Sequence, residues 1–171
     1  MLVAIGIIYL YYFNTGLSIN ESNIEIISIS EDTDTDIDTD SNSEINRDTK
    51  IYGSLSERAG SMGCKFFNTA FERHGINSVY KSFSVNNISK ALISAQYLGF
   101  SGCAISMPFK VTAFSLMDEV DNAAKKVGNI NTVLMTSDTM IGYNTDYYAA
   151  LKLITHYNKG FDTLYVLGNG G

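Results

Sequence analysis

From residue 50 onward, the spacing of hydrophobic and polar positions switches repeatedly between a strand period and a helix period. The stretch "DTKIYGSLS" predicts a strand, and "CKFFNTAFERHG" predicts a helix that ends at Gly75 and carries on one face Phe66, Phe67, Ala70 and Phe71. "NSVYKSFSV" predicts a second strand. "NISKALISAQYLG" then predicts a helix that Asn87 caps and Gly99 ends, with a core face of Ile88, Ala91, Leu92, Ala95 and Leu98.

The same alternation continues to the end of the chain. "FSGCAISM" predicts a strand, Pro108 begins a helix that runs to about Asp118, and "DNAAKKVG" predicts a further short helix. "NINTVLM" and "MIGYN", joined by a turn at "TSD", predict a β-ribbon or a late antiparallel addition. "TDYYAALKLITHYNKG" predicts a helix that ends at Gly160, and "DTLYVLGNGG" begins a new strand-helix unit. Strands that alternate with helices indicate an α/β fold, an open and mostly parallel sheet with helices on both faces.

Residues 1–49 follow neither period. "MLVAIGIIYLYYF" is apolar but shorter than the roughly 20 residues that a membrane-spanning helix needs, and no basic residues open it as they open a secretory signal. A weak signal, a membrane contact of residues 1–13 and no targeting role are its alternative interpretations. "EDTDTDIDTDSNSE" predicts a disordered acidic linker, because its carboxylates repel one another and little can be buried. It lacks the glycine and the final glutamate of an EF-hand calcium loop.

Charge changes the picture of the rest of the chain. The formal net charge is −6, but residues 1–46 hold 9 of the 18 acidic residues and none of the 12 basic ones, which leaves +3 for the remainder. This balance suits a site for an anionic small molecule and is too weak to indicate nucleic-acid binding. The two cysteines, Cys64 and Cys103, form no pattern of a disulfide framework or a metal site. We therefore expect a reducing compartment, no metal and no nucleic acid.

Candidate chemistry lies where strands pass into helices. In "AISMPFK", Ser106 and Lys110 occupy the crevice position at which open α/β sheets bind ligands. A lysine in the first turn of a helix faces the positive end of the helix dipole, which disfavours its charged form and suits a proton-transfer role. A lysine that simply reaches solvent is the alternative. In "GYNTD", Asp146 opens a helix and is either a functional carboxylate or an ordinary N-cap.

In order along the chain, "SMPFK", "NINTV", "GYNTD" and "VLGNGG" resemble the motif series of the shikimate dehydrogenase family of aromatic amino acid biosynthesis. The resemblance covers about residues 51–171, the N-terminal half of such an enzyme. It implies domains at 50–145 (substrate-binding and catalytic), 146–160 (linking helix) and 161–171 (the start of a truncated nicotinamide-binding Rossmann domain).

The resemblance also implies roles for single residues. The catalytic pair of the family falls on Lys110 and Asp146, and its substrate-binding residues fall on Ser61, Ser106 and Asn131. Two positions depart from the family pattern: Gly63 replaces a second serine, and Ala104 replaces an asparagine that holds the substrate. These departures make the chain more similar to the shikimate dehydrogenase-like subgroup and leave shikimate and quinate as alternative substrates.

The resemblance implies NADP as cofactor, with NAD as the alternative, and a cytoplasmic enzyme that acts on a shikimate-like polyol acid. Its nucleotide loop would begin with Gly168, Gly170 and Gly171, but the helix that should follow is absent, so we expect a fragment that retains no cofactor and has no activity alone. A non-catalytic ligand-binding module and a membrane-tethered relic are the other hypotheses.

Overall fold

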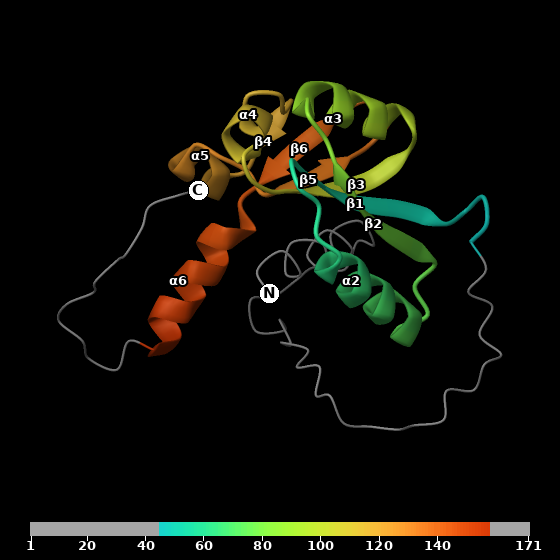
Figure 1. The fold of residues 1–171 in the computed structure, drawn as a ribbon. Coiled ribbons are helices and arrows are strands. Elements are labelled where there is room, and N and C mark those ends of the chain that lie inside the picture. Colours follow the sequence, from blue (N-terminus) through green and yellow to red (C-terminus); the bar gives the residue numbers. More distant parts are fainter. Residues whose placement is uncertain (1–44, 158–171) are drawn as a thin grey trace.

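The alternating apolar pattern forms one six-stranded sheet with flanking helices in the computed structural model, which describes residues 45–157 (Figure 1). The elements in chain order are β1 (Lys50–Ser56), α2 (Met62–Arg73), β2 (Ser78–Ser84), α3 (Ile88–Tyr97), β3 (Phe100–Ile105), α4 (Lys110–Phe114), β4 (Glu119–Val120), α5 (Asn122–Val127), β5 (Thr132–Met135), β6 (Met140–Tyr143) and α6 (Thr145–Tyr157).

The strand order is β2-β1-β3-β5-β6-β4. β1 pairs in parallel with β2 and β3, and β4 pairs in parallel with β6. β5 is antiparallel to both β3 and β6, so the predicted β-ribbon is confirmed as an antiparallel addition next to β3. The expected α/β class with a mostly parallel sheet is therefore confirmed for the described residues. The predicted boundaries of the domains stay predictions.

Each face of the sheet carries its own apolar cluster, because neighbouring residues of a strand point to opposite faces. α2 lies on one face, and α3 and α4 lie on the other (Figure 1). Under α2, Phe67 and Phe71 pack with Tyr52, Tyr80 and Ala104. Under α3, the buried cluster comprises residues of several strands and helices, including Leu55, Ile88, Leu92, Cys103, Ile105 and Val133. Burial raises the pKa of the Cys103 thiol to about 12, so that this cysteine stays protonated within the core.

The ends of the helices follow the predicted local chemistry. The side chain of Asn87 accepts a hydrogen bond from Lys90 N at 3.0 Å and caps α3 as expected. Gly75 and Gly99, which follow α2 and α3, have φ of 61° and 75°. The prediction that Leu98 lies on the core face of α3 is wrong. Leu98 is the C-cap of α3 and is 69% exposed, because the helix ends at Tyr97.

The helix predicted from Pro108 to about Asp118 is shorter than expected. Its helical residues are Lys110–Phe114, after a cis Met107–Pro108 peptide bond. Asp118 instead bonds to the sheet: its N donates to Met140 O at 3.0 Å, and its side chain accepts from Met140 N at 2.7 Å. These bonds end the helical path and start the short strand β4, which the sequence pattern did not reveal.

α6 begins at Thr145 and extends away from the sheet (Figure 1). Its predicted end at Gly160, the expected Rossmann strand with Gly168, Gly170 and Gly171, and nearly all of the leader at residues 1–49 lie outside the described residues. Among residues 45–157, no helix is long and apolar enough to cross a membrane.

Candidate active site

Lys110 is held in place by the turn that follows β3. Ser106 N donates to Leu55 O at 3.0 Å, and Phe109 N donates to Ser106 O at 3.0 Å, so the turn is fixed to the end of β1. Lys110 is the first residue of α4, as expected for a lysine at the start of a helix. Its own backbone oxygen accepts from Ile130 N at 3.2 Å. The turn between β3 and α4 therefore places Lys110 at the carboxyl ends of β1 and β3.

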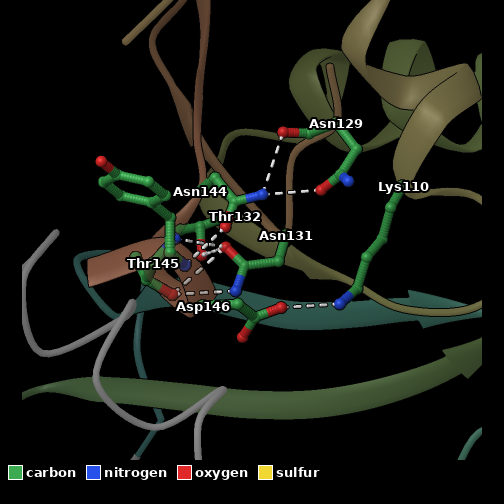
Figure 2. Close-up of polar contacts among 8 residues, drawn as sticks. Lys110, Asn129, Asn131, Thr132, Asn144, Thr145 and Asp146 are labelled. Atoms are coloured by element: carbon green, nitrogen blue, oxygen red, sulfur yellow. Dashed lines mark hydrogen bonds and ion pairs between the residues drawn. The ribbon is translucent and has the colours of Figure 1, made fainter. Parts of the chain in front are cut away.

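Asp146 meets Lys110 from the other side of the site. Lys110 Nζ lies 2.7 Å from Asp146 Oδ2, and the two side chains are 17% and 32% exposed (Figure 2). Asp146 is the second residue of α6, so the positive end of the α6 dipole favours its negative charge. The interpretation of Asp146 as the N-cap is wrong, because Asn144 Oδ1 accepts from Tyr147 N at 2.9 Å and caps the helix. Half-buried and paired, Lys110 differs from a lysine that simply reaches solvent.

Asn131 lies beside this pair in a buried network of polar side chains (Figure 2). Its Nδ2 donates to Thr145 Oγ1 at 2.9 Å, and its Oδ1 accepts from Thr145 N at 3.0 Å and from Thr132 Oγ1 at 2.9 Å. The side chain thus joins the beginning of β5 to the first turn of α6. Its predicted contact with a substrate stays a prediction.

The two serines of the candidate site lie at the ends of other elements. Ser61 is exposed just before α2, and its side chain makes no capping hydrogen bond to the helix. Ser106 is half-buried directly after β3. Ser61 thus lies between β1 and α2, and Ser106 lies between β3 and α4; the binding roles of both serines stay predictions.

The two residues that depart from the family pattern, Gly63 and Ala104, pack against the aromatic cluster under α2. Ala104 is 1% exposed and contacts the cluster that contains Tyr52 and Tyr80. A Cβ atom at Gly63 would lie 3.1 Å from the Tyr80 ring and 3.4 Å from its hydroxyl. Small residues at both positions therefore leave room for the aromatic rings. Burial raises the pKa of Tyr80 to about 12.

Sequence reasoning missed Asn129 and Asn144, which are 6% and 2% exposed. Asn144 Nδ2 donates to Asn129 Oδ1 at 2.6 Å and to Asn129 O at 3.2 Å. The available signal was the presence of two asparagines in the stretch "GNINT" and one in "GYNTD", next to residues that the pattern buries. Within residues 45–157, no group of three or more histidine, cysteine or acidic side chains could hold a metal ion.

Comparison with known proteins finds one family repeatedly. The family model of the shikimate dehydrogenase substrate binding domain matches residues 58–133. A shikimate dehydrogenase-like protein of Haemophilus influenzae is 39% identical over 129 residues, which is 74% of this chain and 47% of that protein. The NADP(+) shikimate dehydrogenase of Pyrococcus abyssi is 31% identical over 125 residues, 71% of this chain and 47% of the relative. The chain thus spans about half the length of these curated relatives.

Solved structures of related proteins match this chain over a similar share of their length. A shikimate 5-dehydrogenase-like protein superposes with a TM-score of 0.65 at 38% identity, over 68% of this chain and 44% of its own. A shikimate dehydrogenase solved in complex with NADP+ gives a TM-score of 0.61 at 30% identity, over 70% and 43% of the two chains. Residues 58–133 thus match the substrate-binding domain of the shikimate dehydrogenase family, and the chain is similar to proteins of that family over about half of their length.

Proposed function

We propose that the described residues form the substrate half of a nicotinamide-dependent oxidoreductase that interconverts an alcohol and a ketone on a shikimate-like polyol acid. The observation that carries this proposal is the contact of 2.7 Å between Lys110 Nζ and Asp146 Oδ2. The two residues begin different helices and meet at the strand ends, where ligands bind in open α/β sheets.

Lys110 is the proposed proton carrier. In the oxidation direction, the substrate hydroxyl gives its proton to the neutral Lys110 amine, and in the reduction direction the Lys110 ammonium returns a proton to the ketone oxygen. The nicotinamide, when bound, supplies the hydride acceptor or donor for the same carbon. Asp146 holds the amine in place and balances the charge that Lys110 gains. Lys110 and Asp146 thereby act as one unit.

Ser61, Ser106 and Asn131 are the proposed substrate-binding residues. Their hydroxyl and amide groups would fix the ring hydroxyls or carboxylate, so that the reacting carbon lies close to Lys110. Gly63 and Ala104 remove two polar side chains from this set, which favours the shikimate dehydrogenase-like subgroup. Shikimate and quinate are the two substrates to be compared.

NADP is the proposed cofactor, with NAD as the alternative, because relatives and solved structures carry NADP in their names. Gly168, Gly170 and Gly171 would begin its binding loop, and they lie outside the described residues. Since the chain spans about half the length of its relatives, we propose that its 171 residues alone do not turn over substrate.

Calorimetry on the 171-residue chain tests the substrate half directly. Shikimate or quinate should bind without any cofactor, and Ser61→Ala and Ser106→Ala should weaken the binding. Ser137→Ala is the matched control, because Ser137 is exposed in the turn between β5 and β6. Absence of binding for both acids would contradict the proposal. Binding without turnover after the nucleotide half is added would favour a non-catalytic binding module.

A further inference from the structure

One short segment, Asn129–Asn131, is bonded to Lys110 and to the two residues that precede Asp146. On one side, Ile130 N donates to the backbone oxygen of Lys110 at 3.2 Å. On the other side, Asn129 accepts from the Asn144 side chain, and Asn144 caps the helix that carries Asp146 (Figure 2). The segment therefore sets how far the start of α4 lies from the start of α6.

The Asn144 side chain uses both ends of its amide. Nδ2 donates to Asn129 Oδ1 at 2.6 Å and to Asn129 O at 3.2 Å, while Oδ1 accepts from Tyr147 N at 2.9 Å. Only 2% of Asn144 and 6% of Asn129 is exposed, so water does not compete for these bonds. An amide supplies both the donor and the acceptor that this place requires. A serine can keep the helix cap but is too short to bridge to Asn129 as well.

The Lys110–Asp146 pair needs such support. Both side chains are half-buried, so the attraction between the two charges is offset by the hydration that each loses and by the freedom that both side chains lose. Its geometry must then come from the backbone elements that carry the two residues. We propose that Asn144 and Asn129 are positioning residues, which hold the first turn of α6 so that Asp146 faces Lys110.

Lysine labelling of the 171-residue chain tests this arrangement without substrate or cofactor. A limiting amount of an amine-reactive reagent at fixed pH labels each lysine in competition, and peptide mass spectrometry gives the labelling of Lys110 relative to Lys65 and Lys125, which are exposed. Because the Lys110 amine is held against Asp146 Oδ2 at 2.7 Å, the pair shields Lys110 from the reagent. Asp146→Asn should raise the relative labelling of Lys110 roughly threefold.

Asn144→Ala should raise the labelling of Lys110 as much as Asp146→Asn does, and Asn129→Ala should raise it by a smaller factor. Asn144→Ser, which keeps the cap alone, should lie between the wild type and Asn144→Ala. The matched control is Asn87→Ala, which removes an asparagine cap of the same kind from α3. A merely structural role would change all lysines together or none.

Several results would overturn the proposal. Wild-type labelling of Lys110 in Asn144→Ala, or an equal rise in Asn87→Ala, would show that Asn144 does not position Asp146. No rise in Asp146→Asn would show that the pair does not protect Lys110. If circular dichroism shows that Asn144→Ala is unfolded, Asn129→Ala decides, because it leaves the cap on α6 in place. The functional consequence rests on the proposed role of the pair, whereas labelling measures only its geometry.

Discussion

Lys110 and Asp146 are 36 positions apart in the sequence, yet Lys110 Nζ and Asp146 Oδ2 lie 2.7 Å apart at the first turns of two helices. Each residue taken alone has an ordinary explanation, as a solvent-exposed lysine or a helix cap. Their contact, together with the separate cap supplied by Asn144, makes a joint role the better explanation. If they act as one unit, removing either should cost about as much as removing both.

Kinetics on a chimera test this joint role. The chain would be extended by the C-terminal half of the Haemophilus influenzae relative to supply the nucleotide-binding part. Lys110→Ala should lower kcat roughly 100-fold or more with little change in KM, because a positioned acid and base is lost. Asp146→Asn should do the same, and the double variant should be little worse. Lys125→Ala, an exposed lysine of α5, is the control. Near-normal turnover of Lys110→Ala would show that Lys110 is not the proton carrier.

Asn131→Ala should act mainly on binding. The amide of Asn131 joins β5 to Thr145 at the start of α6, so its loss both removes a proposed substrate contact and loosens the wall of the site. We expect the Kd for shikimate or quinate to rise roughly fivefold, since a hydrogen bond of this kind contributes about 1 kcal/mol. Calorimetry measures it, with Thr136→Ala in the exposed β5–β6 turn as control. An unchanged Kd would remove Asn131 from the substrate-binding set.

The sequence predicted the elements and the residues of the Lys110–Asp146 pair better than the polar side chains that support the pair. Periodicity identified β1, α2, β2, α3 and β3, because each buries apolar side chains at the spacing of its own element. Lys110 and Asp146 were identified because they lie at element ends within motifs. The bonds of Asn144 to Asn129 join residues 15 positions apart, and no local period reports such a contact. β4 was missed because it is two residues long and is held by backbone bonds to β6.

Gly142 should tolerate no side chain. It is buried in β6, and a Cβ atom there would lie 2.8 Å from Ile130 Cγ2 and 2.8 Å from Met117 Cγ. Gly142→Ala should therefore lower the free energy of unfolding by about 1–3 kcal/mol, as overpacking of a filled core does. Urea unfolding measures the change. Gly60→Ala is the control, because nothing lies within 4 Å of a Cβ atom there, and an equal loss in both variants would contradict the packing explanation.

Tyr80 should make the domain lose stability at alkaline pH. Burial raises the pKa of Tyr80 from 10.0 to about 12 in the folded chain. Above pH 10 the unfolded chain releases this proton while the folded chain keeps it, so the contribution is complete below pH 10 and is lost as pH rises to about 12. The loss amounts to about 1.4 kcal/mol for each pH unit within this window. The Tyr80→Phe variant lacks the phenolic hydroxyl, so it has no proton to release between pH 10 and pH 12.

Urea unfolding of wild type and Tyr80→Phe at pH 8 and pH 11 measures this difference. The two should differ little at pH 8, and at pH 11 the wild type should have lost about 1.4 kcal/mol more than the variant. Tyr97→Phe is the matched control, because Tyr97 is 88% exposed at the end of α3 and its hydroxyl meets water in both states. Equal alkaline losses in wild type and Tyr80→Phe would mean that the Tyr80 hydroxyl reaches water in the folded chain. The Tyr80 hydroxyl would then pack more loosely against Gly63 than the structure shows, where a Cβ atom added at Gly63 would lie 3.4 Å from this hydroxyl.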